Sequence, residues 1–255
     1  MELPRPKIDL NADIGESSPN ERTGNDERLL RTITSGNVAC GFHAGDPSVM
    51  RHTVRAAVKA GVSIGAHPSF RDLEGFGRRE LQIEPREIGD LVLYQIGALS
   101  AIARAENATL RHVKPHGALY NMSVKRVDIA EAIARAVASF DNTLRLVGLP
   151  GSELLAAGSR LGLSVAAEGF ADRSYESDGS LTPRHVAGAV LTEPTHVAER
   201  AVRMVRQGHV VARDGTTLSM KVDTICVHGD TPGAAELAAA VRDGLECAGI
   251  TVAAL

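Results

Sequence analysis

The chain has 255 residues, enough for one substantial hydrophobic core, and its 28 basic and 31 acidic residues give a net charge of −3. This balance argues against nucleic-acid and membrane-surface proteins, which carry a basic excess. No apolar run approaches the roughly 18 residues of a membrane span, and the N-terminus has no signal-peptide core. Three cysteines without a CxxC pair indicate reduced thiols. We therefore expect a cytoplasmic protein that binds neither nucleic acid nor membranes.

Short β-rich segments alternate with longer helical patterns along the chain. The predicted strands are 7–12, 36–40, 62–66, 111–114, 144–148, 164–168 and 223–227. The predicted helices are 26–34, 47–60, 85–106, 126–139, 152–161, 194–207 and 232–248. Residues 210–221 predict a small inserted hairpin around Asp214-Gly215. The alternation predicts an α/β fold with a parallel sheet, and the lack of a linker predicts a single domain, 1–255.

The two faces of the predicted strands differ in polarity. In the first strand Leu10 lies on one face, and Asp9 and Asn11 lie on the other, because side chains alternate along a strand. An open parallel sheet is covered by helices on both faces and is apolar throughout. A barrel instead has one face against helices and one toward its interior. The pattern predicts a (β/α) barrel of about seven parallel strands, with a polar active-site cavity at the strands' C-terminal ends.

Four histidines follow four different predicted strands. They are His43, His67, His116 and His228. A single histidine at a strand end is usually a hydrogen-bonded structural residue, but four of them favour a shared site. Asp13 with His43 and His67 could hold Zn²⁺ or a similar ion. Metal-free acid–base chemistry is the competing use, and the spacing does not decide between them, so a bound metal is possible but no ligand is assigned.

Lys114 ends the fourth predicted strand, in the stretch HVKPHGALY. A buried lysine can act as a base or stabilise an oxyanion, or it can simply pair with Asp9 or Glu168. The candidate catalytic set is Asp13, His43, His67, Lys114, His116, Glu168 and His228. The candidate substrate-binding set is Asp9, Asn11, Asn37, Arg78, Asp172, Arg173 and Asp230.

Two polar loops, 67–80 and 168–184, follow predicted strands and carry several arginines. Each is either a lid whose arginines hold a carboxylate or phosphate, or a solvated surface excursion. The sequence contains no GxxxxGK[ST] phosphate loop, no GxGxxG and no GxSxG. It therefore offers no standard nucleotide site.

Six stretches of the chain together resemble one family. They are IDLNADIGES, ITSGNVACGFHAGDP, GVSIGAHPSF with GFGRR, VKPHGALYN, EGFADRSY and VDTICVHGDTPGA. They occur in order over nearly the whole chain, and they resemble the lactam-utilisation (LamB/YcsF) family of 5-oxoprolinase A subunits. The resemblance implies a barrel related to the glycoside hydrolase/deacetylase barrels. It also implies a role in the ATP-dependent opening of 5-oxo-L-proline to L-glutamate, with partner subunits B and C.

Within this resemblance we expect the chain to carry the hydrolytic half of the reaction. Asp13 or His116 would be the base for water, and Lys114, His43 and His67 would stabilise negative charge. Arg173 or the GFGRR arginines would hold the substrate carboxylate. Two alternatives are a stand-alone metal-dependent deacetylase or amidohydrolase acting on N-acyl sugars, and a non-catalytic scaffold subunit.

Overall fold

Seven parallel strands close into a barrel in the computed structural model, which describes residues 5–16, 24–231 and 233–255. In order around the barrel they are β1 (Lys7–Ile14), β2 (Ser35–Ala39), β3 (Ser63–His67), β4 (Leu110–Val113), β5 (Arg145–Gly148), β6 (Val165–Phe170) and β9 (Thr224–Val227). Strand β9 pairs with β6 and also with β1, where Asn11 lies opposite Cys226. This last pairing closes the barrel, so the predicted fold class is confirmed.

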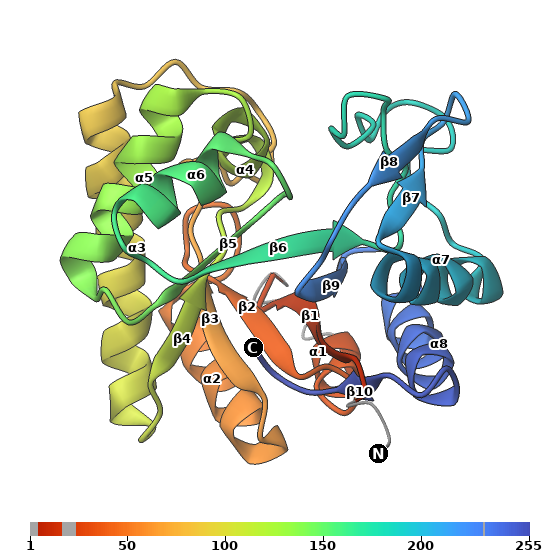
Figure 1. Cartoon of the computed structure of the whole chain (residues 1–255). Coiled ribbons are helices and arrows are strands. Elements are labelled where there is room, and N and C mark those ends of the chain that lie inside the picture. Colours follow the sequence, from red (N-terminus) through yellow and green to blue (C-terminus); the bar gives the residue numbers. More distant parts are fainter. Residues whose placement is uncertain (1–4, 17–23, 232) are drawn as a thin grey trace.

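Helices surround the barrel and follow most of the strands (Figure 1). They are α1 (Gly24–Leu29), α2 (Pro47–Ala60), α3 (Pro85–Ala105), α4 (Gly117–Ser123), α5 (Val127–Phe140), α6 (Glu153–Arg160), α7 (Pro194–Gln207) and α8 (Ala234–Cys247). Helix α2 begins at Pro47, as predicted, because the preceding residue Asp46 accepts hydrogen bonds from the backbone N–H groups of Ser48 and Val49. Helix α4 was not predicted, since it has only seven residues and begins at a glycine.

The alternation of polarity along the strands places the hydrophobic core outside the barrel wall. Ile8, Leu10 and Val38 are buried toward the helices, and the opposite faces of β1 and β2 carry buried polar side chains. Gly65 on β3 makes room inside, because a Cβ at this position would lie 2.0 Å from Nε2 of His112 on β4. The interior is thus filled by polar side chains that must satisfy one another.

The inserted hairpin is confirmed, with β7 (His209–Val211) antiparallel to β8 (Thr217–Ser219), and it projects from the barrel in Figure 1. The short strand β10 (Thr251–Val252) pairs with the start of β1 and was not predicted, because two residues give no periodic signal.

The 168–184 loop is held against helix α7. Arg200 on α7 donates to the backbone carbonyls of Ala171 and Arg173, which anchors this loop beside the barrel mouth.

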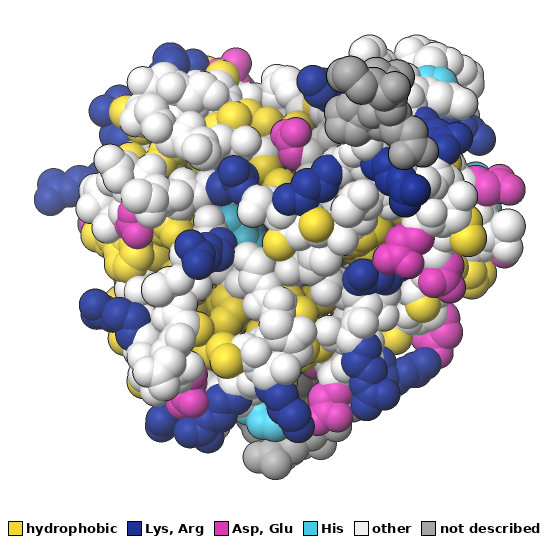
Figure 2. Space-filling view, turned by 60° about the horizontal axis from the view of Figure 1, so that its bottom comes forward, with side chains coloured by type: hydrophobic (Ala, Val, Ile, Leu, Met, Phe, Trp, Pro, Cys, Tyr) yellow, Lys and Arg dark blue, Asp and Glu magenta, His cyan; other side chains and the backbone are white. Residues whose placement is uncertain are grey.

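Among the residues that the structure describes, α3 is long and apolar enough to cross a membrane by length and composition alone, since an 18-residue window of this 21-residue helix has a mean hydropathy of 1.2. One such helix is weak evidence, because the core helices of water-soluble proteins pass the same test. Ile88, Val92 and Ile96 of α3 are buried in the core. On the face in Figure 2, Lys and Arg side chains are spread out with Asp and Glu among them.

Candidate active site

Asp9 is at the centre of one layer of polar side chains inside the barrel. Its carboxylate accepts hydrogen bonds from the hydroxyl groups of Thr34 (2.7 Å), Ser35 (2.6 Å) and Thr224 (2.5 Å). Burial raises the pKa of Asp9. Asp9 is therefore satisfied by hydroxyl groups, and the structure does not pair it with Lys114 as one sequence interpretation had proposed. Asp9 was expected to bind substrate, and the structure places it buried among these three hydroxyl groups.

A chain of amide and imidazole groups forms the next layer. Asn37 donates to Asn11 Oδ1 at 2.7 Å and accepts from His112 Nε2, also at 2.7 Å. Asn11 in turn donates to Glu168 Oε1 at 3.1 Å. Burial lowers the pKa of His112 to about 3, so this ring is a neutral donor. Asn11 and Asn37 were expected to bind substrate, but they lie in this layer and support the groups above it.

Lys114 occupies the centre of the barrel interior. Its Nζ lies 2.8 Å from Glu168 Oε1, 3.0 Å from Asp13 Oδ1 and 3.1 Å from Cys226 Sγ. Burial alone would lower the pKa of Lys114, but the acidic neighbours, Asp13 foremost, raise it well above its ordinary value. Burial would likewise raise the pKa of Asp13, but His67 and Lys114 lower it well below its ordinary value. The pair is therefore an ammonium and a carboxylate.

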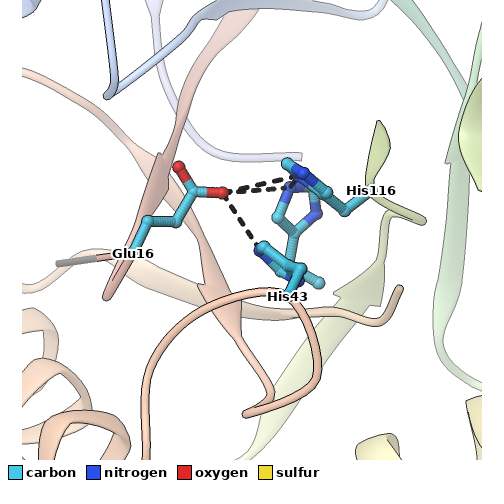
Figure 3. Close-up of side chains that lie close together, drawn as sticks. Glu16, His43 and His116 are labelled. Carbon is cyan, nitrogen blue, oxygen red and sulfur yellow. Dashed lines mark hydrogen bonds and ion pairs between the residues drawn. The ribbon is translucent and has the colours of Figure 1, made fainter. Parts of the chain in front are cut away.

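A glutamate and three histidines, Glu16, His43, His67 and His116, lie close together. Figure 3 shows Glu16 beside His43 and His116. Glu16 Oε1 is 3.1 Å from His43 Nε2, 3.4 Å from His116 Nδ1 and 3.9 Å from His67 Nε2. The rings of His43 and His116 are stacked with centroids 3.8 Å apart. Burial lowers the pKa of both rings well below the ordinary value. Burial, with Asp13 next, raises the pKa of Glu16 well above its ordinary value.

The fourth predicted histidine, His228, is held apart from the other three. Its Nδ1 is 3.0 Å from Asp172 Oδ2, and its backbone N–H donates to the same oxygen at 3.2 Å. Its ring stacks on Phe170 with centroids 5.1 Å apart. Burial would raise the pKa of Asp172, but His228 lowers it. Asp172 was expected to bind substrate, and the structure instead places it fully buried behind the His228 ring, which it orients.

A cavity of about 690 Å³ opens above these groups, within the range of small-molecule sites. Its walls include Asp13, His67, Lys114, His116 and His228, together with Pro183 and other residues of the anchored 168–184 loop. This loop is therefore a wall of the cavity. Asp9, Asn11 and Asn37 do not line it among the residues that the structure describes.

Three arginines gather at the rim of the cavity. Arg78 and Arg184 both reach Asp230, at 2.5 and 3.4 Å. Arg173 uses Nε and Nη2 to donate to backbone carbonyls of the loop. Burial, and then the charge of Arg184, lowers the pKa of Arg173 to about 10. Asp230 pairs with Arg78 and Arg184 but not with Arg173, and Glu80 also lines the cavity, so the three positive charges outnumber these two carboxylates and the rim can hold a further anion.

Sequence reasoning missed three residues of the site. Glu16 follows the end of β1 inside the IDLNADIGES stretch, and its signal was an acidic residue directly after a strand. Arg184 lies on the loop and lacks a periodic pattern. Tyr120 on α4 is fully buried, and burial together with the nearby charge of Glu168 raises the pKa of its phenol well above the ordinary value.

Among the residues that the structure describes, two groups of side chains have the donors of a metal site. The first is Glu16, His43, His67 and His116, and the second is Asp13, Cys226 and His228. In each group the ligand atoms, one from each residue, lie within 4.8 Å of one another. The sequence had suggested Asp13 with His43 and His67. The structure brings His43 and His67 together and places Asp13 Oδ1 3.4 Å from His67 Nε2, and Glu16 is the carboxylate that contacts both histidines.

The chain matches known proteins over nearly its full length. The model of the LamB/YcsF family matches residues 8–255. This chain belongs to the LamB/YcsF family. The A subunit of the 5-oxoprolinase of Chloroflexus aggregans is 57% identical over 245 residues, which cover 96% of this chain and 97% of that protein. Its counterpart in Methylococcus capsulatus, with the same name, is 56% identical over 248 residues, 97% of this chain and 95% of that protein.

A solved structure supports the same family assignment. The crystal structure of the lactam utilization protein from Thermus thermophilus has a TM-score of 0.91 and 47% identity, covering 98% of this chain and 100% of that one. The family resemblance expected from the six sequence stretches is therefore confirmed over nearly the whole chain.

Proposed function

We propose that this chain is the A subunit of an ATP-dependent 5-oxoprolinase, which hydrolyses 5-oxo-L-proline to L-glutamate together with partner subunits B and C. The observation that carries the proposal is the 57% identity, over almost the full length of both chains, to a protein named as a 5-oxoprolinase A subunit. The site supports it, because a polar cavity with an arginine rim suits a small anionic substrate.

The chemistry explains why ATP is needed. A five-membered lactam is an unstrained amide and a poor electrophile. Transfer of the terminal phosphoryl group of ATP to the lactam oxygen releases ADP and activates the ring carbon. Water then adds to that carbon, and the carbon–nitrogen bond breaks to give the amine and an acyl phosphate. A second water releases phosphate and leaves the carboxylate of glutamate.

We assign the hydrolytic half of this sequence to the residues of the cavity. Lys114 supplies a buried positive charge that stabilises the oxyanion formed when water adds. Asp13 accepts a hydrogen bond from that water and orients it. His228, whose Nδ1 faces Asp172, has the arrangement of an acid–base histidine: it takes the proton that the adding water loses and passes it to the leaving amine. Glu168 holds Lys114 in place from the opposite wall.

The arginine rim has a matching role. Arg78 and Arg173 would bind the carboxylate of 5-oxoproline, and Arg184 would contact the phosphoryl group of the activated intermediate. Because no standard phosphate loop is present in the sequence, we place the nucleotide itself mainly on the partner subunits.

The decisive experiment measures glutamate formation from 5-oxoproline by this chain with and without the two partners and ATP. We expect turnover only when all are present. Lys114→Ala and His228→Ala should abolish turnover of the reconstituted complex while it still assembles, as judged by size-exclusion chromatography. Normal turnover by both variants would make this chain a scaffold. Deacetylation of N-acyl sugars by the isolated chain would instead favour the deacetylase alternative.

A further inference from the structure

Three histidines and one glutamate, His43, His67, His116 and Glu16, each have one donor atom within 4.8 Å of the donor atoms of the other three. The separations between these donor atoms are 3.1 Å (Glu16–His43), 3.4 Å (Glu16–His116), 3.9 Å (Glu16–His67) and 2.9 Å (His67–His116). Ligands around a tetrahedral Zn²⁺ with bonds of about 2.0–2.1 Å are about 3.3 Å apart. Four of the six donor separations are therefore close to this spacing, and all six are within 4.8 Å. Because the rings of His43 and His116 are stacked with centroids 3.8 Å apart, one of them must turn to direct its nitrogen at a shared ion.

Hydrogen bonds on the far side of two rings fix where their protons lie. His67 Nδ1 lies 2.7 Å from the backbone carbonyl of Lys114, and His116 Nε2 lies 2.9 Å from the carbonyl of Phe76. A carbonyl oxygen only accepts, so each of these nitrogens carries the hydrogen. In a neutral ring the other nitrogen then presents a lone pair.

Those two lone-pair nitrogens face each other. His67 Nε2 and His116 Nδ1 are 2.9 Å apart, a distance at which a hydrogen bond needs one proton between them. With both outer protons donated to the carbonyls, the gap between the rings is filled either by an added proton, for which Asp13 Oδ1 lies 3.4 Å from His67 Nε2, or by a metal ion between two neutral rings. A metal ion at this point takes the place of that proton. Donation of the outer ring N–H to a backbone carbonyl is also how metal-binding histidines are usually oriented.

The loop that supplies one of these carbonyls is held in a strained conformation. Phe76 has a φ of 53°, in the left-handed region that residues with a side chain rarely adopt. The next residue, Gly77, has no space for a side chain, because a Cβ there would lie 2.8 Å from the Cβ of His43. The Phe76 ring packs edge-on against both His43 and His116. Strain of this kind persists where the surroundings demand it, often at binding sites.

We propose that Glu16, His43, His67 and His116 bind one divalent transition-metal ion, with Zn²⁺ as the best fit to three imidazoles and one carboxylate. Imidazole ligands favour Zn²⁺, Fe²⁺, Ni²⁺ or Cu²⁺ over Mg²⁺ and Ca²⁺. The second donor group, Asp13, Cys226 and His228, is less suitable. Lys114 Nζ lies 3.0 Å from Asp13 and 3.1 Å from Cys226, so a metal ion there would meet a fixed ammonium charge.

The test reads metal binding and not turnover, so its result is independent of the proposed 5-oxoprolinase activity. The full chain is stripped with a chelator, and Zn²⁺ and Co²⁺ are titrated back, with bound metal counted by elemental analysis. We expect one ion per chain. His67→Asn and the near-isosteric Glu16→Gln should each weaken binding by more than about 100-fold, beyond the 10–100-fold typical of an outer-shell loss.

Matched controls come from the second donor group. Cys226→Ser and His228→Asn should retain one tightly bound ion, and circular dichroism should confirm that every variant is folded. The Co²⁺ protein should show the strong visible bands of a four-coordinate site without a near-ultraviolet thiolate band. The proposal is overturned if the stripped chain binds no Zn²⁺ at micromolar concentrations. It is also overturned if the folded Glu16→Gln variant binds as tightly as the parent, or if Cys226→Ser loses the ion.

Discussion

Lys114 and Glu168 face each other across the interior of the barrel, with Nζ and Oε1 separated by 2.8 Å. Lys114 directly follows β4 and Glu168 lies on β6, and these strands are not neighbours in the sheet, so closure of the barrel brings the two residues together. Both side chains are almost wholly removed from water. A pair of this kind is costly to break, because the remaining partner stays buried and charged.

Lys114→Met should therefore destabilise the fold as well as stop turnover. We expect the free energy of unfolding, measured by urea denaturation, to fall by about 3–5 kcal/mol. The double variant Lys114→Met with Glu168→Gln should recover part of that loss, because one unpaired carboxylate is neutralised. A single variant within about 1 kcal/mol of the parent would show that water reaches the pair.

Alanine substitutions at two glycines distinguish a steric clash inside the barrel from an effect of helix propensity. Gly65→Ala should destabilise the barrel by about 1–3 kcal/mol, because the new methyl group would collide with the buried His112 ring. Gly97→Ala on α3 is the matched control, since nothing lies within 4 Å of a Cβ there. It should stabilise the protein by about 0.5–1 kcal/mol through helix propensity. Equal melting temperatures for the two variants would contradict the packing of β3 against β4.

The buried ring of His112 should make stability depend on pH. Burial lowers its pKa from 6.5 to about 3 in the folded chain. Below pH 6.5, His112 therefore binds a proton in the unfolded chain but stays neutral in the folded chain. The free energy of unfolding falls as the pH falls from 6.5 toward about 3. His112→Gln removes this contribution, which is on the order of a few kcal/mol.

Denaturant melts of His112→Gln and the parent between pH 7 and pH 4 measure the effect. The stability of the variant should decline less steeply over this interval. His196→Gln, at an exposed position of α7, should follow the parent. Parallel curves for His112→Gln and the parent would show that His112 is already protonated in the fold.

The arginine rim should recognise the carboxylate of the substrate. Arg78→Gln should raise the KM for 5-oxoproline by about 10- to 100-fold with a smaller change in kcat, since a charge-assisted hydrogen bond is worth about 1.5–3 kcal/mol. The lactam 2-pyrrolidinone has no carboxylate, so any slow turnover of it should be the same in the variant and the parent. An equal loss for both compounds would assign Arg78 to the shape of the loop.

Asp172 should act through His228. Asp172→Asn keeps the shape but removes the charge behind the ring, so kcat should fall by about 100-fold or more with little change in KM. The control is Asp223→Asn, whose carboxylate accepts from the backbone N–H of Ala167 away from the cavity. It should keep kcat within about twofold. A normal kcat in Asp172→Asn would remove His228 from the proton-transfer role.

Periodicity along the chain was enough to predict the barrel. The polar face of β1, with Asp9, Asn11 and Asp13, was assigned to the interior before any contact was known, and the structure confirms that placement. Alternation is a local property, because each side chain points opposite to its neighbour whatever the strand pairs with. The inward orientation of Lys114 and Glu168 followed from the same rule.

The depth of each polar side chain in the barrel, and the residues that it contacts, could be assigned only from the tertiary structure. The sequence did not separate Asp9, at the closed end with three hydroxyl donors, from Asp13 at the cavity floor. Nor did it single out Glu16, which lies beyond the strand, where alternation no longer applies. Those assignments depend on strand register and on loop conformation, such as the left-handed turn at Phe76 and Gly77. Both are set by contacts between residues far apart in the chain, which no local pattern records.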